Sequence, residues 1–179
     1  MHSSSALFRF LASSLLLLSA CGSDSDEVRA SALMAPLNGG MAMGNLQFLE
    51  AEHDGSRHVQ LDITLSQCPE GIHGFHIHEG TSCGNNGDDA LGHWNPTGEA
   101  HGRYGQTPFH QGDIGNVTCN AQGQGTLSIE AEGWTLDNDP NTGILGRAAI
   151  LHANEDTYVQ PTGNAGGRIA CGLITLDGA

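Results

Sequence analysis

The chain contains no lysine. Its six basic residues are all arginine, and 20 aspartates and glutamates outnumber them, so the formal net charge is -14. Proteins that bind nucleic acid or an anionic membrane surface depend on clustered positive charge. The composition therefore argues against both kinds of partner, and any anionic substrate must be attracted by a local positive feature.

Aromatic residues are also scarce, with two tryptophans and two tyrosines in 179 residues. Beyond the N-terminus no stretch shows the apolar stripe of an amphipathic helix. By contrast, the chain has 26 glycines and 10 histidines. This balance suits a turn-rich β protein with metal chemistry better than a helical enzyme, and the length suits one domain.

The N-terminus resembles an export signal. Arg9 precedes the apolar run Leu11–Leu18, which is too short for a membrane-spanning helix of about 20 residues. The letters LSAC end this run at Cys21 and resemble a bacterial lipoprotein processing box. We expect residues 1–20 to be a signal peptide, Cys21 to carry a lipid anchor, and residues 21–29 to form an acidic tether. The protein would then be an exported, membrane-anchored lipoprotein that faces the periplasm or the cell exterior. An ordinary signal peptide cleaved elsewhere is the alternative.

From residue 30 onward the patterns are those of strands. Val59–Ser66 alternates apolar and polar residues throughout, as a strand with one buried face does. Other stretches of strand length are residues 44–52, 125–132, 146–152 and 169–176. We therefore expect residues 30–179 to form one all-β domain, an antiparallel sandwich or barrel with polar turns.

Two segments break this pattern. Residues 78–113 are rich in Gly, Asn, His and Pro and show no periodicity. A loop of that length inside a compact domain needs something to pin it. The candidates for pinning are His93, His101, His110, Asp113 and Cys83. The second segment, residues 153–167, is polar and contains glycine.

The stretch Gly74–His78 places two histidines on one strand face. Successive side chains of a strand point to opposite faces, so His76 and His78 share one face while Phe75 and Ile77 share the other. Two imidazoles at this spacing can converge on one metal ion. A solvated face that carries two histidines by chance is the alternative for this pentapeptide taken alone.

Further histidines and one aspartate offer two metal sites. One set is His93, His101, His110 and Asp113, and the other is His76, His78 and His152 with a share of His93. Three imidazoles and one carboxylate can close a tetrahedral zinc site, which would stabilise the long loop. Ligation by nitrogen alone, with an open position, suits copper.

Four blocks of sequence occur in a characteristic order. They are GFHIHE from Gly74, GHWNP from Gly92, HQGDIGNV from His110 and GNAGGRIACG from Gly163. Together they resemble the copper-zinc superoxide dismutases, and the resemblance runs from about Ala30 to Leu176. It implies an eight-stranded antiparallel Greek-key barrel with a long metal-binding loop and a shorter channel loop. This family is itself a standard example of the sandwich architecture.

The resemblance also implies the roles of individual residues. The copper ligands fall on His76, His78, His93 and His152, and the zinc ligands on His93, His101, His110 and Asp113. His93 would therefore bridge one copper and one zinc ion per subunit. Asp156 falls on a carboxylate that links a copper histidine to a zinc histidine, Arg168 on a guanidinium beside the copper, and Thr162 on the channel rim.

The activity implied is the dismutation of superoxide to dioxygen and hydrogen peroxide. Copper would change oxidation state, and zinc would serve geometry and electrostatics. His93 would take up and return a proton, so His93 and Arg168 are the expected catalytic residues. The alternative is a non-enzymatic surface lipoprotein that holds zinc or copper, but storage needs no arginine that docks an anion.

Four cysteines remain after Cys21, and residue chemistry alone leaves three pairings open. The resemblance selects Cys83 with Cys171. The family's topology then brings Cys68 and Cys119 to one pole of the barrel, where we expect a second disulfide, with two buried free thiols as the alternative. A homodimer is possible, although the segment between His78 and Cys83 is too short to support carrying over the eukaryotic dimer face.

Overall fold

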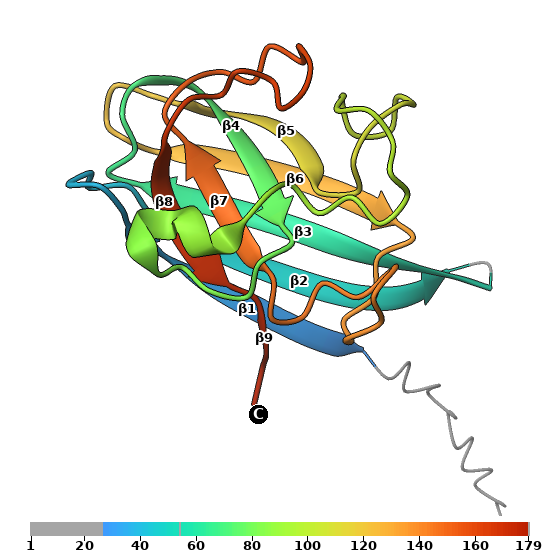
Figure 1. The fold of residues 1–179 in the computed structure, drawn as a ribbon. Helices are drawn as coiled ribbons and strands as arrows, with labels where there is room; N and C mark the ends of the chain where they lie inside the picture. Colours follow the sequence, from blue (N-terminus) through green and yellow to red (C-terminus); the bar gives the residue numbers. More distant parts are fainter. Residues whose placement is uncertain (1–26, 54, 179) are drawn as a thin grey trace, which may run out of the picture.

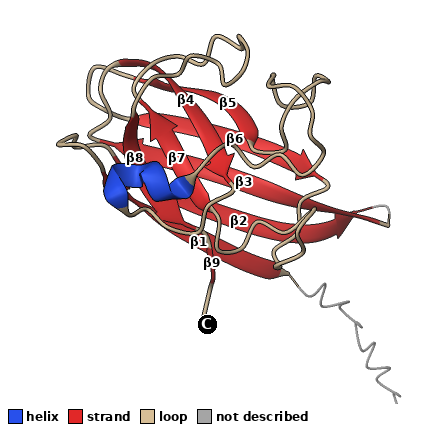
Figure 2. Cartoon of the chain, viewed as in Figure 1, coloured by secondary structure: helices blue, strands red, loops and turns tan. Residues whose placement is uncertain are grey.

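The computed structural model describes residues 27–53 and 55–178. The expected signal peptide, Cys21 and most of the tether lie outside these residues. The ordered elements of the described chain are strands apart from one short helix, and the strands curve into a barrel (Figures 1 and 2). A large apolar core and a smaller buried cluster pack between them. Within the described ranges, no helix has the length and apolar character needed to cross a membrane.

The strands form one antiparallel sheet that closes on itself. They are β1 (Val28–Pro36), β2 (Met43–His53), β3 (Ser56–Ser66), β4 (Gly71–His78), β5 (Asp113–Cys119), β6 (Gly125–Glu132), β7 (Ala148–His152), β8 (Arg168–Leu173) and β9 (Thr175–Leu176). The sheet order is β2-β3-β6-β5-β4-β7-β8-β1-β9, and β2 also pairs with β1. This closure gives the expected eight-stranded barrel, with the two-residue β9 as an extension along β1.

The core follows from the alternation of apolar residues. In β3 the side chains of Val59, Leu61, Ile63 and Leu65 are buried, and the residues between them are half-buried or exposed. Burying one such side chain contributes about 1.5–3 kcal/mol relative to leaving it exposed. The one-faced strand predicted from the alternation is confirmed, and it extends back to Ser56.

Several strand ends differ from the expected ranges. β1 begins at Val28, inside the expected tether, because Val28 pairs with Glu50 of β2. β7 begins at Ala148 rather than at Gly146, whose φ of +77° is not a strand conformation. β8 ends at Leu173, and β9 resumes after one residue.

β5 was not expected, and it lies beside a seam in the barrel. It pairs along β4, but it meets β6 at one residue pair only, Cys119 with Gly125. The disulfide Cys68–Cys119, with Cα atoms 6.1 Å apart, joins the chain after β3 to the end of β5 at this point. The second disulfide, Cys83–Cys171, has a Cα separation of 5.8 Å. Both expected pairings are therefore present.

A short 3-10 helix, η1 (Asn85–Ala90), lies within the long loop after β4. Its two internal residues Asn86 and Gly87 have positive φ angles, so it is a pair of tight turns rather than a regular helix. Figure 1 shows η1 lying against β8, and the two elements are in contact. The loop is thus fixed next to the strand that begins with Arg168.

Candidate metal centre

β4 separates the histidines from the core as the alternation predicts. Phe75 and Ile77 are fully buried in the apolar core, whereas His76 and His78 lie on the opposite face beneath the loops. The β4–β5 pairing shifts register between Phe75 and His76, and the β7–β8 pairing shifts just before His152. Such bulges change the direction in which a side chain points, so each one helps to aim a histidine.

His76, His78, His93 and His152 form a cluster whose ligand atoms all lie within 4.8 Å of one another. Nδ1 of His78 donates to the carbonyl of Leu91 at 2.9 Å, and Nδ1 of His152 donates to that of Gly166 at 3.1 Å. Because carbonyls only accept, the lone pairs of both rings are on Nε2. These two Nε2 atoms face each other at 3.4 Å, an arrangement that a cation between them would stabilise.

The contacts of His76 also indicate a cation in the first cluster. Its Nε2 donates to Oδ2 of Asp156 at 2.7 Å, and its Nδ1 is buried without a hydrogen-bond partner. A buried imidazole nitrogen without a partner is costly in a protein interior. The nitrogen-only cluster therefore fits copper, with a metal ion as the missing partner.

The second cluster contains His93, His101, His110 and Asp113, again with ligand atoms within 4.8 Å. Nδ1 of His101 lies 2.9 Å from Oδ2 of Asp113, and Nδ1 of His110 lies 3.2 Å from Oδ1. Neither nitrogen forms a hydrogen bond despite these distances. Ligand atoms that point at a shared centre rather than at each other have this geometry, and three imidazoles with one carboxylate fit zinc.

Asp156 connects the two clusters. Its Oδ2 accepts from His76, and its Oδ1 lies 3.0 Å from Nε2 of His101. Asn116 of β5 fixes the main chain of Asp156, because its carboxamide accepts from the N–H at 2.8 Å and donates to the C=O at 2.9 Å. The carboxylate is fully buried, so it has one position from which to orient both rings.

Gln160 holds the main chain of His101 in the same way. Its Oε1 accepts from the N–H at 3.2 Å, and its Nε2 donates to the C=O at 2.7 Å. We did not expect Gln160 or Asn116 from the sequence. Glutamine and asparagine are not among the expected metal ligands. Both contacts also join segments that are far apart in the chain, so the local sequence gives no sign of them.

Burial keeps His76, His78 and His152 of the first cluster neutral. It lowers the pKa of His76 to about 4 against the opposing effect of the hydrogen bond to Asp156, and it lowers the pKa of His152 to about 3. Burial and the nearby His93 likewise lower the pKa of His78 to about 2. These rings have free lone pairs at neutral pH, as metal ligation requires.

The second cluster differs because it contains carboxylates. Burial alone would raise the pKa of Asp113, but the 2.9 Å contact with His101 and the hydrogen bond from His93 outweigh it and hold that pKa well below its usual range. Conversely, burial lowers the pKa of His101, but the close contact with the Asp113 carboxylate and the hydrogen bond to Asp156 outweigh it and raise the pKa to about 9. In the absence of metal, the ring of His101 therefore keeps both protons at neutral pH.

A pocket of about 310 Å³ opens onto the first cluster. His78, His93 and His152 line it together with Thr162 and Arg168. The guanidinium of Arg168 donates through NH1 to the carbonyl of Gly87 and through NH2 to that of Leu91. In the described part of the chain Arg168 forms no ion pair, so a positive charge faces the pocket.

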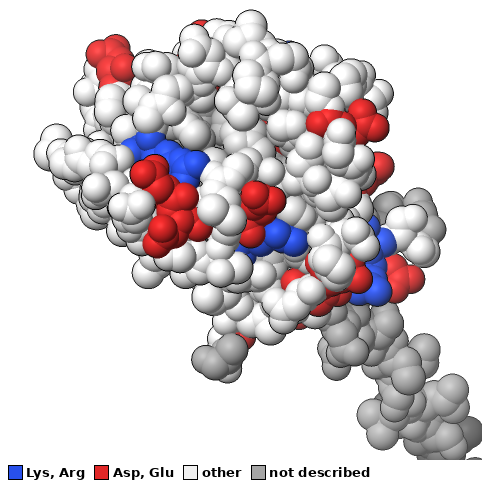
Figure 3. Space-filling model, viewed as in Figure 1, with Lys and Arg blue, Asp and Glu red and all other residues white. Residues whose placement is uncertain are grey.

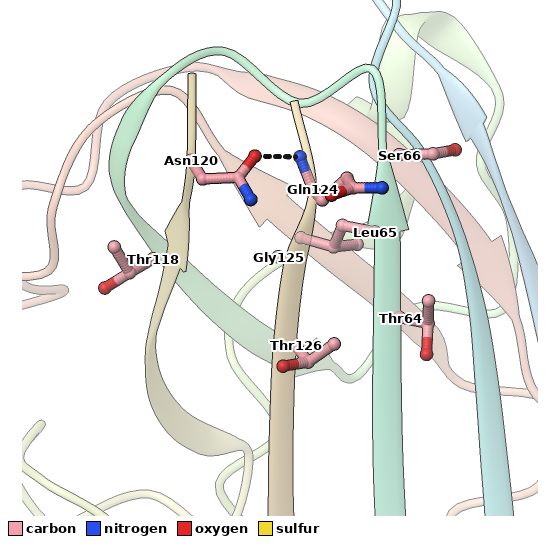
Figure 4. A pocket seen from close by; sticks show the side chains of 8 residues that line it. All are labelled: Thr64, Leu65, Ser66, Thr118, Asn120, Gln124, Gly125 and Thr126. Atoms are coloured by element: carbon pink, nitrogen blue, oxygen red, sulfur yellow. Dashed lines mark hydrogen bonds between the residues drawn. The ribbon is translucent and has the colours of Figure 1, made fainter. Parts of the chain in front are cut away.

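No other pocket described for residues 27–53 and 55–178 combines histidines with an arginine. On the face shown in Figure 3, basic side chains are few and each lies beside acidic ones. A wider groove of about 620 Å³ is lined by neutral residues alone: Thr64, Leu65, Ser66, Thr118, Asn120, Gln124, Gly125 and Thr126 (Figure 4). It contains no titratable group, so the chemistry belongs to the histidine clusters.

The structure brings together every metal-site residue expected from the sequence, and Thr162 lies at the rim of the same pocket. A comparison with protein-family models matches residues 42–174 to the family described as copper/zinc superoxide dismutase (SODC). The match covers about three quarters of the chain.

Proposed function

The chain belongs to the copper/zinc superoxide dismutase family, and we propose that it dismutates superoxide outside the cytoplasm, with copper in the four-histidine cluster and zinc in the cluster that contains Asp113. The observation that carries this assignment is the pocket, where three histidines of the first cluster and Arg168 face one space. An anion that enters the pocket therefore meets the positive charge of Arg168 beside the histidines that would hold copper.

Copper supplies one-electron redox chemistry when bound, whereas zinc has no redox chemistry and fixes geometry. His93 belongs to both clusters. Its Nδ1 lies 2.8 Å from Oδ1 of Asp113, which leaves Nε2 for the other cluster and for the pocket that His93 lines. His93 is therefore placed to hold a proton at Nε2 and to give it to the peroxide product.

Arg168 binds and orients the substrate. Superoxide is an anion, and a guanidinium offers it a charged donor with fixed direction. Two main-chain carbonyls hold this guanidinium without neutralising it. The disulfide Cys83–Cys171 anchors the loop that carries these carbonyls. Thr162 adds a hydroxyl to the rim, and we assign it to the entrance of the channel.

Two disulfides indicate an extracytoplasmic protein, because thiols are kept reduced in the cytosol. We propose further that residues 1–20 are a signal peptide and that Cys21 carries a lipid anchor on the membrane. The acidic tether that follows would hold residues 30–179 away from the lipid surface. The possible homodimer stays a prediction without an assigned interface.

The test is metal analysis with a dismutase assay on the purified protein and two variants. The wild type should bind copper and zinc and dismutate superoxide. His152→Ala should keep zinc and lose both copper and activity. His58→Ala is the control, since His58 lies outside both clusters and faces Glu130 at 3.4 Å. Full loading with both metals but no dismutation would contradict the proposal and favour a metal-holding lipoprotein.

A further inference from the structure

Three of the four tryptophan and tyrosine rings of this chain form a series of contacts, and the fourth stacks on a histidine of the second cluster. Trp94 directly follows His93, and its ring centroid lies 6.2 Å from that of Trp134. The ring of Trp134 lies 6.1 Å from that of Tyr104. Tyr158 stacks on His101 at 6.5 Å with an interplanar angle of 20°. These four residues are all the tryptophans and tyrosines of the sequence.

The rings lead from the interior to one surface groove. Trp94 and Trp134 are buried, at 2% and 0% exposure, whereas Tyr104 and Tyr158 are half-buried. Both tyrosines line a groove of about 470 Å³ over β5 and β6. A continuous series of ring contacts therefore runs from the residue after His93 to this groove, and a second, shorter route runs through His101.

We propose that Trp94, Trp134 and Tyr104 carry one-electron oxidising equivalents from the metal centre to this groove, where a small thiol-type reductant restores Tyr104. The inference rests on the dismutase function. That activity produces hydrogen peroxide beside the copper site, where copper in its reduced form would supply one electron to peroxide and so yield hydroxide and a hydroxyl radical. Unless another group reacts first, this radical attacks the ligand histidines.

Each transfer conserves atoms and charge. Trp94 gives one electron to the hydroxyl radical, which becomes hydroxide, and Trp94 becomes a radical cation. Trp134 returns an electron to Trp94 and is oxidised in turn. Tyr104 then reduces Trp134 and releases its hydroxyl proton to water in the groove that it lines, so a neutral tyrosyl radical forms. A thiol gives a hydrogen atom to that radical and leaves as a thiyl radical.

The surroundings of Trp94 favour transfer in the outward direction. The guanidinium carbon of Arg147 lies 4.6 Å from the centroid of the Trp94 ring. This contact stabilises a neutral ring and repels a radical cation. Nε1 of Trp94 is buried without a hydrogen-bond partner, so no neighbour accepts its proton. Positive charge is therefore less stable on Trp94 than further along the series.

The next two rings donate hydrogen bonds to main-chain carbonyls, whose negative ends stabilise an oxidised ring. Nε1 of Trp134 donates to the carbonyl of Gln111 at 3.2 Å, and the hydroxyl of Tyr104 donates to the carbonyl of Glu132 at 3.4 Å. Burial raises the pKa of Tyr104 to about 12. Tyr104 is accordingly a neutral phenol that loses its proton together with its electron, and it holds the radical at the surface.

Packing is the competing explanation for the ring series. The same rings hold the loop between β4 and β5 against the segment after β6, and Tyr104 also contacts Phe109 at 5.2 Å. Phenylalanine substitutions separate the two roles. Trp134→Phe and Tyr104→Phe keep an aromatic ring in place but remove the oxidisable group. Phe109→Leu disturbs the packing and leaves all oxidisable rings present.

The experiment exposes the metal-loaded protein to excess hydrogen peroxide. Peptide mass spectrometry measures oxidation of the ligand histidines, and freeze-quench electron paramagnetic resonance detects tyrosyl radical. Dismutase activity is measured on fresh samples. Trp134→Phe and Tyr104→Phe should lose most of the radical signal and oxidise their ligand histidines several-fold faster than the wild type. Phe109→Leu should match the wild type in both measurements.

Two results would contradict the proposed transfer route, and a third would contradict the proposed dismutase function. Equal histidine oxidation in wild type and Trp134→Phe would rule out the transfer route, as would a Phe109→Leu variant that behaves like Trp134→Phe. Both would be seen in protein that still dismutates superoxide. If the fresh, fully loaded wild type does not dismutate superoxide, the proposed function fails, and the route loses the source of its oxidant.

Discussion

The carboxamide of Gln160 pairs with both main-chain groups of His101, at 3.2 Å to its N–H and 2.7 Å to its C=O. His101 is 2% exposed, so neither group has water as an alternative partner. Gln160 lies in the segment between β7 and β8, and His101 in the loop between β4 and β5. One side chain thus joins the two loops that cover the metal centre.

Gln160→Met should weaken zinc binding by roughly ten- to a hundredfold, as loss of an outer hydrogen-bond partner of a metal ligand usually does. Without the amide, ordering of the His101 main chain must occur when the ion binds. Competition with a chromophoric chelator measures the zinc affinity, and copper affinity should not change. Gln122→Met, an exposed glutamine in the turn before β6, is the control. Equal zinc affinities in the two variants would contradict this role.

Gly163→Ala should displace Asp156 from its place between the clusters. Gly163 has a φ of +78°, and a Cβ there would overlap Oδ1 of Asp156 and lie 2.7 Å from Nε2 of His101. We expect a loss of zinc affinity of roughly tenfold or more. Gly133→Ala is a matched control, because its φ is +77° and nothing lies within 4 Å.

The control separates backbone strain from the steric clash. A side chain at positive φ costs roughly 1–2 kcal/mol of stability by itself. Both variants should therefore unfold at a lower temperature, but only Gly163→Ala should bind zinc more weakly. A parallel loss of zinc affinity in Gly133→Ala would mean that strain, and not contact with Asp156, is the cause.

Zinc binding to the metal-free protein should release a proton from His101. Its pKa is raised to about 9 by Asp113 and Asp156, which outweigh the lowering effect of burial. The ligand nitrogen must lose its proton, so zinc affinity should rise about tenfold per pH unit between roughly pH 6 and pH 8 and level off near pH 9. Calorimetry in buffers of different ionisation enthalpy counts the protons.

Copper binding to the first cluster should behave differently. The pKa values of His76 and His152 are lowered mainly by burial, to about 4 and about 3. These rings hold no proton that copper must displace over the same pH range, so copper affinity should be nearly flat. Zinc binding that releases no proton would contradict the prediction for the second cluster, because it would show that His101 is neutral in the metal-free protein.

Arg168→Gln should lower kcat/KM for superoxide by roughly tenfold, the low end of the range for electrostatic steering, of which this enzyme family is an established example. The chain has no lysine, so Arg168 is the positive charge that lines the pocket. The salt dependence of kcat/KM should flatten as well. Arg57→Gln, on β3 and paired with Glu50 at 3.1 Å, is the control. An unchanged salt slope in Arg168→Gln would contradict this dependence.

Strands with strict alternation were predictable because burial of one face dictates both their existence and their faces. The range of β6 agrees with the expectation, and β3 differs only at its start. β5 was missed because its seven residues DIGNVTC contain a glycine at a φ of +114° and little alternation. β5 forms because it pairs with β4, and the local sequence gives no sign of that pairing.

The ligand residues were accessible from the sequence because histidine and aspartate at ordered spacings carry a chemical signature. Gln160 and Asn116 carry none, since a carboxamide is common on any surface. Their role arises from the way the segment between β7 and β8 packs against β5 and against the loop between β4 and β5. The ring series through Trp94 was hidden for the same reason, because it joins the loop between β4 and β5 to the segment after β6.

The ligands of the first cluster come from β4, from the loop after η1 and from the end of β7. An unfolded chain offers only scattered histidines, which any available divalent ion could occupy in the order of intrinsic affinity. The nitrogen tetrad exists only after β4 and β7 have paired and the loop has returned over them. Copper can therefore occupy its complete site only after the barrel has folded, and the folded barrel selects the metal through the geometry of the four histidines.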